Sequence, residues 1–111
     1  FISSSKIGIW LGYVNKSSII GNNINSIKAY GIELYYSSSY NILSSNVLYK
    51  IGTYANNTYS GILIHGYNTP YSTHNIIEGN IIYSDATNKP KYGIYEVYIT
   101  GSENDYNIIT N

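Results

Sequence analysis

A four-residue block that begins with Gly-Ile occurs four times along the chain, and successive copies start 23, 30 and 32 residues apart. The copies are Gly8–Leu11, Gly31–Leu34, Gly61–Ile64 and Gly93–Glu96. A second apolar block follows in Ser18–Ile24, Asn41–Val47, Asn75–Ile81 and Asn107–Asn111, and a third closes each complete unit. Repeats of this size bury their apolar side chains against neighbouring repeats, so the chain is expected to fold as a stack of similar units.

The short blocks are predicted to be strands, three in each unit. They are rich in Ile, Val and Tyr and are bounded by Gly, Asn and Ser, which is typical of strands joined by turns. No window keeps the apolar period of an α-helix over three turns. When one unit makes one lap of a solenoid, equivalent strands pair in parallel about 4.8 Å apart. The sequence therefore predicts an all-β parallel solenoid of about four coils with little or no helix.

Alternation along the first strand of each unit divides its side chains between the core and the outer surface. Ile9, Ile32 and Ile62 are predicted to point inward, each with another aliphatic residue two positions later. The outward set is predicted to be Trp10, Glu33, Leu63 and Tyr95, followed one step along by Gly12, Tyr35, His65 and Val97. One outer face of the solenoid should therefore carry aromatic and ionisable side chains together.

The fourth unit and the second strands need separate expectations. Strict alternation would bury Glu96, so we expect a bulge there, or an inward set of Tyr95, Val97 and Ile99, because an unpaired buried carboxylate costs several kcal/mol. In the second strands, the isoleucines at the start of each block are expected to face the shared axis. These are Ile19, Ile42 and Ile76.

Asparagines recur at the corner between the second and third strands. Asn23, Asn46 and Asn80 each precede an Ile or Val and are interpreted as equivalent. Asn tolerates the left-handed backbone conformation that such a corner requires, and stacked amides can hydrogen-bond from coil to coil. We expect a structural ladder at these positions and not a binding site.

The repeat resembles that of right-handed parallel β-helix proteins of the pectate-lyase-like superfamily. The resemblance is carried by Gly-Ile-x-Leu followed by Asn-Ile-Ile-x-Gly-Asn-x-Ile, clearest in Gly61–Ile82. It implies a right-handed parallel β-helix over residues 1–111, as a segment of a longer solenoid or of a stacked assembly. Members of the superfamily include polysaccharide lyases, glycosidases, carbohydrate-binding modules, viral tail spikes and surface adhesins. An extracellular, cell-surface or virion location follows from the resemblance, but the fold alone does not choose a function.

Composition and charge exclude several classes of function. The chain has no formal net charge and no Arg, so neither a nucleic acid nor an anionic membrane surface is expected as a partner. It has no Cys, and His65 and His74 lack the spacing of a zinc site, so no metal and no cofactor are expected. No stretch is long and apolar enough for membrane insertion.

No catalytic residues are predicted. Family lyases resemble one another in clustered acidic calcium ligands and a basic residue, and family glycosidases in neighbouring Asp residues. This chain has two Asp, Asp85 in an insertion and Asp105 near its end. Glu33 and Glu78 are predicted to lie on different faces, too far apart to act as a pair. The segment is expected to be non-catalytic, and the alternative is a fragment of a lyase or glycosidase with catalytic residues elsewhere.

Fifteen tyrosines are too many for a narrow core that twenty isoleucines already fill. Many must lie on the surface, where a flat apolar ring with a polar tip suits a sugar ring or another protein. A compositional bias of the coding sequence is the alternative origin. The candidate glycan contacts are Trp10, Glu33, Tyr35, His65 and Tyr95. We expect a passive structural and adhesive scaffold that contacts a polysaccharide or a neighbouring subunit, with end-to-end self-association into a filament as a further alternative.

Overall fold

Three parallel sheets of four strands make up the protein. The computed structural model describes residues 1–66, 71–98 and 106–110, and in these residues all regular secondary structure is strand. Sheet A contains β1 (Ile2–Ser3), β4 (Asn23–Ile27), β7 (Val47–Ile51) and β10 (Ile81–Tyr83). Sheet B contains β2 (Ile9–Gly12), β5 (Ile32–Tyr35), β8 (Ser60–Gly66) and β11 (Tyr92–Tyr98). Sheet C contains β3 (Ser18–Ile20), β6 (Ile42–Ser44), β9 (Ile76–Glu78) and β12 (Ile108–Ile109).

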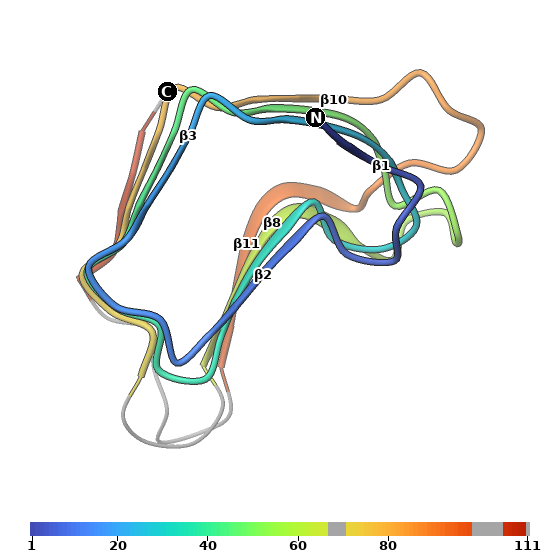
Figure 1. Cartoon of the computed structure of the whole chain (residues 1–111). Helices are drawn as coiled ribbons and strands as arrows, with labels where there is room; N and C mark the ends of the chain where they lie inside the picture. The colour runs from blue at the N-terminus through green and yellow to red at the C-terminus, as the bar shows by residue number, and fades with distance from the viewer. Residues whose placement is uncertain (67–70, 99–105, 111) are drawn as a thin grey trace.

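The chain passes through sheets A, B and C in turn and repeats this path four times. Every strand pairs in parallel with the equivalent strand of the next coil. Figure 1 looks along the solenoid axis with the N-terminal coil in front, and the chain runs clockwise as it recedes, which is a right-handed winding. The prediction of a parallel β-helix with three strands per coil is confirmed. No helix able to cross a bilayer occurs among the described residues.

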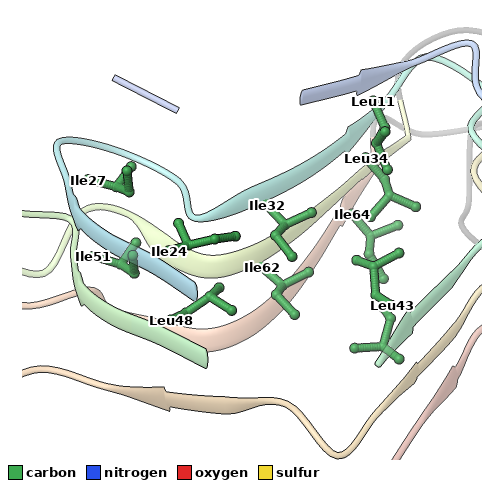
Figure 2. Close-up of a cluster of buried hydrophobic side chains, with 11 residues drawn as sticks. Leu11, Ile24, Ile27, Ile32, Leu34, Leu43, Leu48, Ile51, Ile62 and Ile64 are labelled. Carbon is green, nitrogen blue, oxygen red and sulfur yellow. The ribbon is translucent and has the colours of Figure 1, made fainter. Parts of the chain in front are cut away.

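The core consists of columns of aliphatic side chains that run along the axis. In sheet B, Ile32 and Ile62 form one column and Leu34 and Ile64 another, and all four are fully buried. Figure 2 shows these columns facing the side chains of sheet A, with Leu43 of sheet C beside them. Each residue packs on the equivalent residue of the next coil, which is why the sequence repeats its aliphatic positions.

The glycine that opens each repeat lies against a side chain of sheet A. A Cβ atom at Gly31 would lie 2.5 Å from Cδ2 of Leu48 and 2.7 Å from the backbone oxygen of Gly61. At Gly61, a Cβ atom would lie 2.5 Å from Cγ2 of Ile82. The Gly-Ile pattern therefore has a steric cause, because a larger residue would force sheets A and B apart.

Two columns of asparagine side chains run inside the corners of the solenoid. Between sheets C and A, Asn46 Nδ2 donates to Asn80 Oδ1 and to the backbone oxygen of Ile19, both at 2.9 Å. The backbone N–H of Asn22 donates to Asn46 Oδ1, also at 2.9 Å. The amide of Asn46 thus joins three coils, and since the residue is fully buried, these bonds satisfy groups that water cannot reach.

A second column, which the repeat pattern does not predict, lies between sheets B and C. Asn41 Nδ2 donates to Asn75 Oδ1 at 3.1 Å and to the backbone oxygen of Val14 at 2.8 Å. Asn75 Nδ2 in turn donates to Asn107 Oδ1 at 3.0 Å. Asn41, Asn75 and Asn107, which open the second blocks of the last three units, therefore form a ladder like that of Asn46 and Asn80.

The expected alignment of the first unit is wrong by one residue. Asn23 pairs with Val47, so the ladder position belongs to Asn22, and Asn23 lies outside the ladder. The left-handed residues at this corner are Gly21, Ser45 and Gly79, each preceding the asparagine, and not the asparagines themselves. The misalignment arises because Ser17 occupies the position that Asn41 has in the second unit, so no asparagine marks the start of the first block. The backbone N–H of Ser17 donates to Asn41 Oδ1, which shows that the two positions are equivalent.

The same offset corrects the second strands. Ile19 pairs with Leu43, which pairs with Ile77, and this column faces the core. Ser18 pairs with Ile42, and Ile42 pairs with Ile76. This second column lies on the opposite face of sheet C. The expected inward orientation of Ile42 and Ile76 is therefore wrong, while the inward column is still aliphatic in every coil.

The bulge expected at Glu96 is also absent. Strand β11 pairs with β8 in one continuous register from Ile94 to Tyr98, so Glu96 lies opposite Ile64 at an inward position and its Oε1 is buried. The alternative inward set is wrong for Tyr95, which pairs with Leu63, and for Val97, which pairs with His65, and Ile99 lies outside the described residues. Strands β8 and β11, each seven residues long, pair without interruption. A bulge would turn the Glu96 carboxylate outward but would break this pairing.

The contact at the opening glycine gives a stability prediction. Gly31→Ala should lower the free energy of unfolding by about 1–3 kcal/mol, because the Gly61 backbone oxygen cannot move aside. Gly93→Ala is the matched control, since the nearest atom to its Cβ would be Ile82 Cδ1 at 4.0 Å, and it should leave stability unchanged or raise it by up to about 1 kcal/mol. Urea unfolding measures both, and equal losses in the two variants would contradict this explanation of the repeat.

Candidate functional site

The outer face of sheet B brings the candidate residues together. Trp10 pairs with Glu33, Glu33 with Leu63, and Leu63 with Tyr95, so the four form one row across all four coils. A second row, two residues further along each strand, holds Gly12, Tyr35, His65 and Val97. All five residues selected from the sequence, Trp10, Glu33, Tyr35, His65 and Tyr95, therefore lie on one face, and their role as glycan contacts stays a prediction.

One end of this face carries five aromatic rings in mutual contact, which we call the aromatic cluster. Its members are Trp10, Tyr13, Tyr35, Tyr36 and His65. The ring centroids of Trp10 and Tyr35 are 6.3 Å apart, and those of Tyr35 and His65 are 4.6 Å apart. Trp10 is 51% exposed and Tyr13 is 69% exposed. The cluster thus offers a broad aromatic surface to solvent.

Backbone conformation assembles this cluster. Tyr13 and Tyr36 both have positive φ, 57° and 47°, at equivalent positions just after the strands of sheet B. Their rings stack with centroids 4.9 Å apart and planes 3° apart. Left-handed backbone costs a tyrosine about 1–3 kcal/mol, so the chain maintains strain to place these rings. Sequence alternation missed both residues as part of the site, because it describes strands and not left-handed turns.

Gly12 determines where the indole of Trp10 lies. A Cβ atom on Gly12 would overlap the six-membered ring of Trp10, so the indole lies flat along its own strand over the glycine. From there it reaches Tyr36, with ring centroids 6.4 Å apart. The second row therefore needs a residue without a side chain in the first coil, and the sequence supplies one.

The other end of the face is a groove of about 290 Å³. Leu63 lies among its lining residues with Tyr30, Tyr92 and Tyr95. Tyr92 and Tyr95 stack with centroids 4.7 Å apart, and Lys91 Nζ lies 5.2 Å from the centroid of the Tyr92 ring. His65 lines the groove and also belongs to the aromatic cluster, so the two features are continuous.

Glu33 lies between the cluster and the groove and is 7% exposed. Burial raises the pKa of its carboxyl, and the positive charge of Lys6 opposes the rise in part. Burial also raises the pKa of Tyr30, to which the negative charge of Glu33 adds. Burial lowers the pKa of His65, so its imidazole is neutral at physiological pH. The face therefore presents one carboxylate and one neutral imidazole among aromatic rings.

The remaining acidic and histidine side chains lie elsewhere. Glu78 is on sheet C, in register with Ser44, so it does not face Glu33. Asp85 accepts a hydrogen bond of 2.6 Å from the Tyr49 hydroxyl beyond sheet A, and Asp105 lies outside the described residues. His74 stacks on Tyr40 at another corner, with centroids 4.8 Å apart. In the part of the chain that the structure describes, no three His, Asp or Glu side chains gather as a metal site would require.

No protein-family model matches the chain, and no curated protein and no solved structure matches it significantly. The parallel β-helix fold rests on the three parallel sheets themselves.

The raised pKa of Glu33 gives a pH prediction. A carboxyl with a raised folded-state pKa stabilises the fold below its ordinary pKa, and this contribution is lost as the pH rises through the raised value. Glu33→Gln should therefore match the wild type near pH 4 and become the more stable of the two by about pH 7. Thermal unfolding across this range measures the difference.

The comparison of wild type with Glu33→Gln isolates the effect of Glu33, because Asp85, whose carboxyl pKa is also shifted, is present in both proteins. Asp85 has a lowered pKa, chiefly because of the hydrogen bond from Tyr49, and gives the opposite pH slope in each. A stability difference between wild type and Glu33→Gln that is the same at every pH would contradict the assignment.

Proposed function

We propose that the chain is a non-catalytic, structural and adhesive β-helix segment that binds a glycan on the outer face of sheet B. The aromatic cluster is the observation that carries the proposal. A segment of this kind suits an extracellular, cell-surface or virion protein. The resemblance of the repeat to the pectate-lyase-like superfamily agrees with this setting, since that superfamily includes carbohydrate-binding modules and adhesins.

Aromatic rings at a solvent-exposed site suit a sugar because both have an apolar face and a polar edge. Stacking removes the C–H face of the sugar from water, and tyrosine hydroxyls remain available for hydrogen bonds. Trp10 is half exposed although Gly12 and Tyr36 hold its ring in place. Rings fixed before binding lose little conformational freedom on contact, which favours affinity.

The length of the face favours an oligosaccharide chain. The outward row from Trp10 to Tyr95 takes three steps from coil to coil, and at about 4.8 Å per step it spans about 14 Å. Aromatic side chains lie at both ends of the row, with Glu33 and Leu63 between them. A glycan that follows the row would contact the cluster and the groove together.

Passive binding is favoured over hydrolysis by the placement of the carboxylates. Glycoside hydrolysis commonly uses two carboxyl groups about 5 to 9.5 Å apart. Among the described residues, Glu33 is the acidic side chain of the outward rows on sheet B, while Glu78 lies on sheet C. The described part of this face therefore has groups that can bind a sugar but lacks the pair of carboxyl groups that glycoside hydrolysis uses.

Screening on an array of immobilised oligosaccharides, followed by titration of the best binder, tests the proposal. Trp10→Ala should weaken binding at least about tenfold, the effect of losing about 1.4 kcal/mol of aromatic contact. Gly12→Ala should also weaken binding, because it displaces the indole without removing it. Tyr83→Ala is the matched control, since Tyr83 is 52% exposed and stacked on Tyr49 but lies on sheet A.

Three results would count against the proposal. The first is an array with no bound glycan, and the second is an equal loss of affinity in Trp10→Ala and Tyr83→Ala. The third is release of reducing ends or unsaturated sugars from a bound polysaccharide, which would support an enzyme instead.

A further inference from the structure

Glu33 is an unusual residue for the outer face of sheet B, because its charged side chain is largely buried. Among the described residues that are less than a tenth exposed, Glu33 carries the charged side chain, with an exposed fraction of 7%. The other buried polar residues are Ser and Asn, such as Ser38 and Asn46, which are hydrogen-bonded to neighbouring coils. A buried carboxylate costs far more than a hydroxyl or amide unless it is paired.

Nothing in the described part of the chain pairs with this carboxylate. No hydrogen bond to it is found there, the ion pair found there joins Lys50 to Asp85, and the carboxylate oxygens keep some contact with solvent. The charge of Lys6 acts on Glu33 without forming an ion pair. The carboxylate therefore has unused acceptor capacity on both oxygens.

The fold does not require an acid at this position. The equivalent residues of the other coils are Trp10, Leu63 and Tyr95, all apolar or aromatic. Leu63, directly beside Glu33, is 3% exposed and fills the same kind of space with an aliphatic side chain. Glu33 thus departs from the pattern of its row at a cost in stability, which is typical of residues kept for binding.

We propose that the Glu33 carboxylate is the polar anchor of the glycan site and accepts hydrogen bonds from two hydroxyl groups of a neutral sugar. The inference rests on the proposed function and adds the class of ligand. The two oxygens of the carboxylate match two neighbouring hydroxyl donors, and these charge-assisted bonds are stronger than bonds between neutral groups. The aromatic cluster and the Tyr92–Tyr95 stack lie on either side to hold the sugar rings.

The charges around the site favour a neutral sugar over a charged one. A uronate or sulfate group would meet the Glu33 carboxylate in a partly desolvated place, where like charges repel strongly. The ammonium group of an amino sugar would be attracted to Glu33, but it would be repelled by Lys6 near Glu33 and by Lys91 in the groove. Hydroxyl donors meet neither penalty and satisfy the carboxylate.

Binding should be linked to the protonation of Glu33. The groups that face its carboxyl are Lys6 in the turn after β1, Tyr30 in the turn before β5, and the apolar side chains of Trp10 and Leu63. His65 lies diagonally across the next coil. Hydroxyl donors stabilise the charged carboxylate, so the affinity for a neutral sugar should increase as the pH rises and Glu33 loses its proton.

An array that carries neutral, uronate-containing, sulfated and amino-sugar oligosaccharides tests the inference. Neutral oligosaccharides should bind most tightly, and their affinity should increase between about pH 4 and pH 7. Glu33→Gln should weaken this binding at least tenfold and remove its pH dependence. Glu33→Leu, which copies Leu63, should fold and bind no better than Glu33→Gln. His65→Asn is the control for imidazole titration and should retain the pH dependence.

The outcomes separate the inference from the proposed function. Tightest binding to uronate, sulfated or amino sugars would overturn the inference and leave glycan binding in place. A Glu33→Gln affinity within twofold of the wild type, with the pH dependence kept, would overturn it in the same way. If the folded wild-type protein binds no oligosaccharide on the array, the proposed function fails and the inference fails with it.

Discussion

Hydrogen bonds between buried asparagine amides fix how each coil lies on the next, and the rest of the structure depends on that register. Asn46 is the clearest case, since its amide bonds to Asn80, to Ile19 and to the backbone of Asn22. A slip of one residue would leave such buried groups unpaired, at about 1–3 kcal/mol each. It would also turn aliphatic side chains out of the core.

The same register creates the candidate site as a by-product of stacking. Inward positions must be aliphatic in every coil, but the outward positions of sheet B are free to vary, and there the chain places Trp10, Glu33, Leu63 and Tyr95 side by side. Strained tyrosines and a partly desolvated carboxylate lie together on this face. The scaffold therefore supplies rigidity, and one face of it carries features that reduce stability.

The repeated Gly-Ile block was enough to predict the fold and the register of sheet B, because steric contact and burial act on every copy alike. The sequence predicts the register of the first unit one residue late, since Ser17 replaces the asparagine that marks the other copies. The position of Glu96 cannot be predicted from its local burial cost, because the continuous pairing of β8 and β11 holds it inward. The members Tyr13 and Tyr36 of the aromatic cluster could not be predicted, since alternation carries no information about left-handed turns.

The most direct test of this account is an NMR measurement of contacts made by the indole of Trp10, the single tryptophan of the chain. The stacked register with Gly12 beneath the ring predicts nuclear Overhauser contacts from the indole to the rings of Tyr35 and Tyr36. Backbone contacts between Trp10 and Glu33 should accompany them. Indole contacts with the core residues Leu34 and Ile64, or a pairing of Trp10 with a different residue of the second coil, would contradict the register and the site built on it.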